Sequence, residues 1–207
     1  TLEVRHAGGS YHPVSLPEGV MRFHMTRRTL TPITANNSAS LFALEGDLRL
    51  VEFHSKANAL TDESMEIVAA AAADHGKGII IHNDAQHFSA GVDLNAFRAY
   101  IEAEDWDGID GFLDRFQKAV CALKYTPVPV IGAPSGLAAG GGYEVLAHCD
   151  RLVVHTNSVM GLVESGVGVV PGGGGIKDTF FRWHAAKDSW DEAAWQTWMN
   201  IGYGATG

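Results

Sequence analysis

The spacing of apolar residues alternates along the chain between a strand period and a helix period. Residues 41–53 hold two short apolar stretches on either side of Glu45-Gly46-Asp47, and this pattern predicts a β-hairpin. Thr61 is followed by acidic residues and then by an alanine-rich run that ends at residue 73, which predicts a capped helix. Residues 112–123 repeat apolar side chains at helical spacing and predict a second helix.

Three short apolar runs indicate strands of another kind. Residues 78–82, 127–132 and 150–155 are rich in β-branched side chains, and such continuous runs are typical of strands buried on both faces. A helix that opens at Gly140-Gly141-Gly142 and ends at His148 lies between the last two runs. The repeated order of strand, helix and strand predicts an α/β fold with a mostly parallel sheet and right-handed crossovers.

The two ends of the chain differ from this central part. Residues 1–38 are interrupted by glycines, prolines and Asn36-Asn37, and they are interpreted as an N-terminal arm or linker. Residues 39–182 form the predicted core, and residues 183–207 form a tryptophan-rich helical segment whose apolar stripe is typical of a core or a subunit interface. The chain starts without a methionine and stops soon after this stripe, so we expect it to be a piece of a longer protein.

Composition and charge exclude several classes of function. The 207 residues include 24 acidic and 15 basic side chains, and the net charge of −9 disfavours nucleic acid as a partner. No apolar run reaches the roughly 18 to 20 residues of a membrane span. The two cysteines, Cys121 and Cys149, lie far apart and no signal peptide is present, which favours a cytoplasmic location. The ten histidines show no metal-binding spacing, so we expect no metal site and place them at the surface or at helix ends.

Three glycine-bearing loops are candidate walls of one pocket. They span residues 88–94, 135–144 and 163–175, and each follows a predicted strand or precedes a helix, where backbone amides without intrachain partners can point at a ligand. The alternative is that these glycines serve turns and close helix packing. A dinucleotide-binding or P-loop interpretation fits poorly, because Pro171 stands where a third glycine is needed and Ile176 follows the last glycine.

Two glutamates within these loops are candidates for acid–base chemistry. Glu144 lies in the first turn of the helix that the three glycines open, whereas Glu164 has apolar neighbours. Such different surroundings can separate two carboxyl pKa values enough to divide the roles of acid and base. The alternatives are that Glu144 only complements the helix dipole and that Glu164 is a solvated loop residue.

The order and spacing of four segments resemble the enoyl-CoA hydratase/isomerase (crotonase) superfamily. The segments are Asn58-Ala59-Leu60, residues 88–94, residues 129–150 and residues 164–175, and the resemblance covers residues 39–176. It implies a spiral of ββα units that binds an acyl-CoA thioester, with the family's C-terminal helices missing from this chain. The chain departs from the family pattern at Val163, where a proline is frequent, and at residues 176–182, which leaves the choice of substrate open.

The resemblance also implies roles for individual residues. The backbone N–H groups of Val92 and Gly141 match the oxyanion hole, which stabilises the thioester oxygen as it gains enolate charge. Glu144 and Glu164 match the two acids that hold and activate a water molecule. The residues that would contact the coenzyme A ester are Ala57, Ala59, Ala90, Gly91, Asp93, Leu94, Asn95 and Gly140. Coenzyme A is part of the substrate in this family, so no separate cofactor is expected.

The function that the resemblance implies is enoyl-CoA hydration, the syn addition of water to a trans-2-enoyl-CoA in fatty-acid or related β-oxidation. Two alternatives stay open: an enoyl-CoA isomerase or another enolate-stabilising member, and a non-catalytic domain that binds coenzyme A or mediates assembly. Family members form homo-oligomers, often trimers. An N-terminal arm on a chain without an initiator methionine would suit the crotonase module of a multifunctional protein that also carries a 3-hydroxyacyl-CoA dehydrogenase module.

Overall fold

The computed structural model describes residues 3–18, 20 and 22–204, and the chain divides into two units, Thr1–Thr31 and Pro32–Gly207. In the smaller unit, β1 (Glu3–Arg5) pairs antiparallel with β2 (Tyr11–Pro13), and α1 (Phe23–Thr26) and the 3-10 helix η1 (Arg27–Thr29) follow. The break between the units lies within the segment interpreted as an arm. Residues 32–38 therefore lie in the larger unit.

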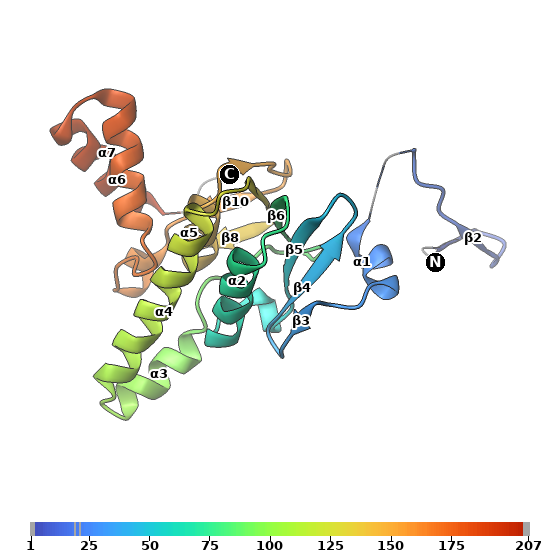
Figure 1. The fold of residues 1–207 in the computed structure, drawn as a ribbon, viewed down its shortest axis with the longest axis horizontal. Coiled ribbons are helices and arrows are strands. Elements are labelled where there is room, and N and C mark those ends of the chain that lie inside the picture. Colours follow the sequence, from blue (N-terminus) through green and yellow to red (C-terminus); the bar gives the residue numbers. More distant parts are fainter. Residues whose placement is uncertain (1–2, 19, 21, 205–207) are drawn as a thin grey trace. The chain divides into compact units, whose positions relative to one another are not determined.

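A six-stranded sheet forms the centre of the larger unit (Figure 1). The strand order is β3-β4-β5-β6-β7-β9, antiparallel from β3 to β5 and parallel from β5 to β9. The strands are β3 (Thr34–Ala35), β4 (Ala39–Leu44), β5 (Leu48–Phe53), β6 (Gly78–His82), β7 (Val130–Ala133) and β9 (Arg151–Leu152). The predicted hairpin is confirmed as β4 and β5, and the predicted strand at residues 78–82 is confirmed as β6. In the run at residues 150–155 only Arg151 and Leu152 form a regular strand, so the predicted strand is shorter than expected. Its backbone still follows β7, because the Val153 N–H donates to the Gly132 carbonyl at 2.9 Å and the His155 N–H to the Pro134 carbonyl at 3.1 Å.

A second, small sheet leads to the candidate site. It consists of β8 (Leu137–Ala139) paired in parallel with β10 (Val159–Gly161). An isolated parallel bridge joins Ser89 to Ala138, so the loop after β6 lies against β8.

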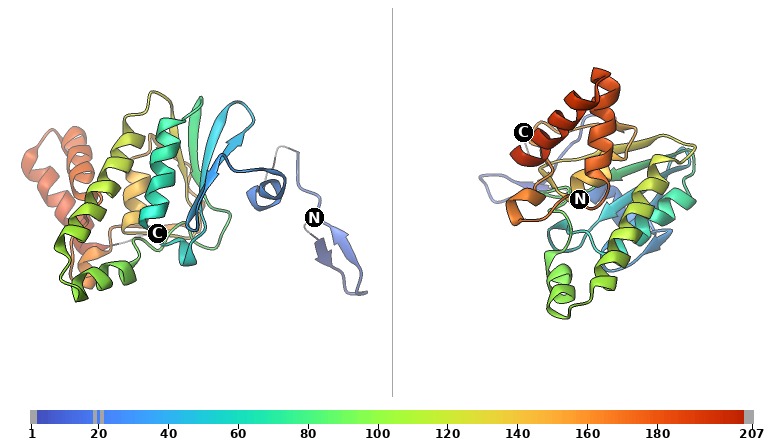
Figure 2. Two further views of the ribbon diagram at one scale, coloured as in Figure 1. Left: turned by 60° about the horizontal axis from the view of Figure 1, so that its bottom comes forward. Right: turned by 90° about the vertical axis from the view of Figure 1, so that its left-hand side faces the viewer.

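Two helices pack together beside the sheet, as Figures 1 and 2 show. The first, α2 (Asp62–Ala73), starts with a capping box. The Thr61 side chain accepts the Ser64 backbone N–H, and the Ser64 side chain accepts the Thr61 backbone N–H. The second, α4 (Trp106–Lys124), buries one apolar face, including Phe112, Phe116 and Leu123. These faces meet strand residues such as Ile79 and Ile81 in one continuous core. The predicted helix at residues 61–73 is confirmed, and the predicted helix at residues 112–123 is confirmed but starts earlier.

The remaining helices are α3 (Leu94–Glu102), α5 (Gly141–Ala147), α6 (Gly175–Lys187) and α7 (Trp190–Tyr203), with 3-10 turns η2 (Lys56–Asn58) and η3 (Glu164–Val167). The helix predicted after the three glycines is confirmed as α5. On α7, Ala193 and Thr197 are buried, whereas Trp190, Trp195 and Trp198 are more than half exposed. The tryptophan stripe is therefore not part of a core within this chain. No helix in the described ranges is long and apolar enough to cross a membrane.

Candidate active site

The candidate site lies where strands β5, β6 and β8 end and where the loops and helix α5 that follow them begin. The loop after β5 and the loop after β6 run side by side: the Ala90 N–H donates to the Ala57 carbonyl at 3.2 Å, and the Leu60 N–H donates to the Gly91 carbonyl at 2.8 Å. A parallel bridge joins Leu60 to Val92. Segments about thirty residues apart in the sequence thus form one wall, and Ala57, Ala59 and residues 90–95 lie together on it.

The Val92 segment also lies against the start of α5. A β-carbon built on Gly141 would approach Val92 Cγ2 to 2.8 Å, and one built on Gly91 would lie 3.0 Å from the Ala139 carbonyl oxygen and 3.6 Å from the Gly141 nitrogen. Gly91 has a φ of +95°, a backbone conformation that favours glycine. Among the described residues, neither the Val92 N–H nor the Gly141 N–H donates to a protein acceptor. The two amides are therefore neighbours that can donate to an external oxygen.

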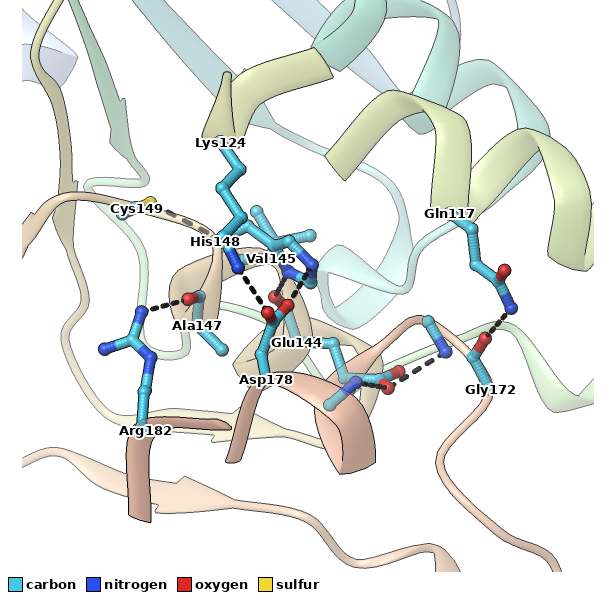
Figure 3. Close-up of polar contacts among 12 residues, drawn as sticks. Gln117, Lys124, Glu144, Val145, Ala147, His148, Cys149, Gly172, Asp178 and Arg182 are labelled. Atoms are coloured by element: carbon cyan, nitrogen blue, oxygen red, sulfur yellow. Dashed lines mark hydrogen bonds and ion pairs between the residues drawn. The ribbon is translucent and has the colours of Figure 1, made fainter. Parts of the chain in front are cut away.

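Glu144 is deeply buried, with 2% of its surface exposed. Its Oε1 accepts the N–H of Gly173 at 2.9 Å and the N–H of Gly175 at 2.8 Å (Figure 3). Burial raises the pKa of Glu144 to about 7, while the two amide donors oppose this shift. The carboxyl group can consequently gain or lose a proton near neutral pH.

Glu164, at the start of η3, lies beside Gly140, the N-cap of the helix that carries Glu144. Its Oε2 accepts the Val163 N–H at 2.8 Å, and its Oε1 lies 2.9 Å from the position that a β-carbon on Gly140 would occupy. Burial raises the pKa of Glu164 as well, and the charge of Glu164 adds to the upward shift at Glu144. Two carboxyl groups that disfavour each other's ionisation favour a state in which the pair holds one proton.

Comparison with known proteins places this arrangement in a family. The family model described as Enoyl-CoA hydratase/isomerase matches residues 48–183, which contain every segment of the candidate site after β5. The chain belongs to the enoyl-CoA hydratase/isomerase family.

Relatives of this family member include multifunctional proteins. The chain is 34% identical over 179 residues to a probable 3-hydroxyacyl-CoA dehydrogenase of Bacillus subtilis, covering 84% of this chain and 22% of that protein. It is 38% identical over 90 residues to the human mitochondrial methylglutaconyl-CoA hydratase, covering 44% of this chain and 25% of that protein. The chain thus spans about a quarter of the length of these relatives, or less.

Solved structures share the fold of this chain. Pseudomonas aeruginosa DspI superposes with a TM-score of 0.69 at 23% identity, over 84% of this chain and 64% of that chain. An enoyl-CoA hydratase from Polaromonas sp. JS666 superposes with a TM-score of 0.68 at 22% identity, over 82% of this chain and 65% of that chain. Identities this low support the mixed α/β crotonase fold alone, which agrees with the fold class predicted from the sequence.

Other residues named from the family resemblance lie at the start of α3. Asp93 caps this helix, because its Oδ1 accepts the Asn95 N–H at 2.9 Å, and Leu94 is exposed.

Gly140 has a φ of +52° and donates its N–H to the Gly161 carbonyl at 2.9 Å, which ties the start of α5 to β10. Within the described ranges there is no group of three or more His, Cys, Asp or Glu side chains that could hold a metal ion.

Sequence reasoning missed a buried ionic cluster beside Glu144. His148 is the C-cap of α5, which agrees with the prediction that the histidines lie at the surface or at helix ends, and its side chain is buried. Its Nε2 lies 2.5 Å from Oδ2 of Asp178, and Asp178 also pairs with the Lys124 ammonium (Figure 3). The four-residue spacing of Glu144 and His148 places both on one helix face, and this spacing was the available signal. Asp178 and Lys124 gave none, because they lie on other helices.

Proposed function

We propose that this chain is an enoyl-CoA hydratase domain that adds water syn to a trans-2-enoyl-CoA and yields a 3-hydroxyacyl-CoA. The observation that carries the proposal is the pair of carboxyl groups, Glu144 on α5 and Glu164 at the start of η3, which are close enough that the charge of Glu164 raises the pKa of Glu144. Both groups have raised pKa values, so the pair can hold one proton at neutral pH. Hydration needs this state, because one group must accept a proton while the other donates one.

The proposed reaction uses backbone and side chains of the described site. The thioester oxygen accepts the N–H groups of Val92 and Gly141, and a donor of this kind stabilises a developing oxyanion by about 3 to 4 kcal/mol. The ionised carboxylate takes a proton from the water as its oxygen bonds to the β-carbon. The protonated carboxyl gives its proton to the α-carbon as the enolate collapses. The pair thereby ends with one proton, as it began.

The names of relatives support a wider proposal. The human relative is named as a hydratase of an acyl-CoA, and the Bacillus subtilis relative is named as a dehydrogenase of the 3-hydroxyacyl-CoA that such a hydration forms. We propose that this chain acts beside a dehydrogenase module in the same protein or assembly. We also propose that it self-associates through the exposed tryptophan face of α7.

The decisive experiment follows crotonyl-CoA hydration by the loss of enoyl absorbance, with product identified by chromatography. We expect formation of 3-hydroxybutyryl-CoA that is lost in Glu144→Gln and Glu164→Gln and retained in Glu66→Gln, an exposed acid on α2. Binding of acetoacetyl-CoA is measured in parallel by calorimetry. Binding without turnover would replace the hydratase proposal with a non-catalytic domain, and conversion of a 3-enoyl-CoA without hydration would replace it with an isomerase.

A further inference from the structure

Three helices contribute to the ionic cluster beside Glu144. Lys124 comes from the end of α4, His148 from the end of α5 and Asp178 from the first turn of α6. The His148 and Asp178 side chains are 0% and 1% exposed, and Lys124 is about one-third exposed. Burying charged groups is costly unless each is paired, so this cluster fixes the three helices in one arrangement or destabilises the fold.

The imidazole ring of His148 contacts two backbone segments: the main chain of Glu144 and the main chain of Gly174. Its Nδ1 lies 2.7 Å from the main-chain oxygen of Glu144; since a carbonyl can only accept, Nδ1 carries a hydrogen. On the other side, a β-carbon built on Gly174 would lie 3.1 Å from His148 Cε1, so the imidazole ring packs directly on this glycine. The Asp178 N–H also donates to the Gly174 carbonyl at 3.0 Å.

Gly174 stands between the two residues that hold the Glu144 carboxylate. Gly173 and Gly175 donate their N–H groups to Glu144 Oε1 at 2.9 and 2.8 Å (Figure 3). The ring of His148 and the Asp178 N–H thus both contact Gly174, the middle residue of the loop whose amides hold the carboxylate. A cluster that served only to join α4 to α6 would make the same contacts, so substitutions must separate the two roles.

The protonation of the cluster follows from its contacts. His148 Nε2 and Asp178 Oδ2 are 2.5 Å apart and form an ion pair when the imidazole is protonated; neither atom has another hydrogen-bond partner among the described residues. Burial lowers the pKa of His148, whereas the Glu144 carbonyl and the Asp178 charge oppose that shift. Lys124 and Lys177 face His148 with positive charge, and Glu164 and Asp178 face Glu144 with negative charge.

We propose that His148 is a positioning residue for Glu144: its contact with Asp178 holds the glycine loop at the start of α6, and therefore the two amide donors, against the Glu144 carboxylate. The inference rests on the proposed function, in which Glu144 acts on the substrate water. His148 itself does not touch substrate.

Three substitutions of His148 separate its two nitrogen contacts. His148→Gln can keep the contact to Asp178, because its amide nitrogen stands in for Nε2. His148→Asn can keep only the bond to the Glu144 carbonyl, and His148→Leu keeps neither. His75→Leu is the matched control, since the His75 Nδ1 also contacts a main-chain oxygen, at 2.8 Å, in the turn before β6 and away from the site.

The first readout is kcat for crotonyl-CoA per site that binds acetoacetyl-CoA, which corrects for any unfolded fraction. We expect His148→Leu and His148→Asn to lower this kcat by about tenfold or more with KM within threefold, because a small misplacement of a reacting group is costly and the ester-binding loops are untouched. His148→Gln and His75→Leu should stay within threefold of wild type. Equal turnover per site in all four variants, or an equal loss in His148→Gln and His148→Leu, would overturn the proposal.

The second readout is independent of turnover. The Glu144 carboxyl is titrated by carbon-13 NMR, with its resonance assigned through Glu144→Gln. Loss of the amide donors removes hydrogen bonds to the charged form, so His148→Leu should raise the midpoint above the wild-type value near pH 7. An unchanged midpoint would overturn the positioning role. A wild-type protein that hydrates no enoyl-CoA would refute the proposed function, while the midpoint would still decide the role of His148.

Discussion

The burial of Glu144 should cost the protein stability in a way that depends on pH. Burial raises the pKa of this group from 4.5 to about 7. One pKa unit corresponds to about 1.4 kcal/mol, so the shift amounts to roughly 3 kcal/mol. The folded state holds the proton more tightly than the unfolded state, so this contribution is favourable below pH 4.5 and is lost as the pH rises through 7. Ionised Glu144 therefore lowers the free energy of unfolding at pH 8.

Glu144→Gln tests this reasoning because the amide oxygen of glutamine can still accept the Gly173 and Gly175 N–H groups. We expect the variant to be more stable than wild type at pH 8 by up to roughly 3 kcal/mol, and the difference to shrink towards pH 4.5. Urea unfolding at several pH values measures it, and the corresponding rise in Tm at pH 8 is up to about 6–12 °C. Glu66→Gln, at an exposed position on α2, is the control. A stability difference that is the same at pH 5 and pH 8 would refute the assignment of a buried, raised carboxyl pKa.

Three further predictions concern the proposed reaction. Glu144→Gln and Glu164→Gln should each lower crotonyl-CoA hydration by at least about 10², with acetoacetyl-CoA affinity by calorimetry within several-fold; a variant with near wild-type turnover would remove its residue from the mechanism. The kcat/KM for hydration should fall as the pH rises above about 7, because the pair then loses its last proton, and a flat stopped-flow profile from pH 6 to 9 would contradict this. Gly141→Ala should lower kcat because its β-carbon would meet Val92 Cγ2 at 2.8 Å, and Val92→Ala in the same chain should restore most of it; no recovery in steady-state assays would show that this contact is not the cause.

The elements that the sequence predicted correctly are those with strong local signals. The alanine-rich helix α2 carries its own capping box, and β6 is a continuous β-branched run. Helix α3 was missed although Leu94, Phe97 and Ile101 recur at helical spacing; none of its residues is fully buried, and Phe97 packs against the core while partly exposed. The strand predicted at residues 150–155 is regular only at Arg151 and Leu152, although the Val153 and His155 N–H groups still donate to the Gly132 and Pro134 carbonyls. The burial predicted for this run is wrong, because Val153 and Val154 are exposed.

The candidate site divides in a similar way. The glycine loops predicted as walls of one pocket gave a reason to pair Glu144 and Glu164 as acid and base, and the family resemblance assigned them the roles of holding and activating a water molecule. The adjacency of Val92 and Gly141 depends on the bridge between Ser89 and Ala138, which is a tertiary contact. Lys124 and Asp178 could not be paired from the sequence for the same reason: 54 residues separate them.

The glycine run at residues 172–175 shows how the site joins structure and chemistry. A β-carbon on Gly173 would lie 2.4 Å from Phe116 and 2.6 Å from Glu144 Oε2, and one on Gly175 would lie 2.9 Å from Glu144 Oε1. The space that side chains would fill is thus occupied by the core and by the carboxylate itself. The same residues supply the N–H groups that limit how far burial can raise the Glu144 pKa. A side chain at Gly173 or Gly175 would both displace the carboxylate and alter its ionisation, so these two glycines are required by the acid that they hold, whereas Gly174 is required by its backbone conformation, with a φ of +103°.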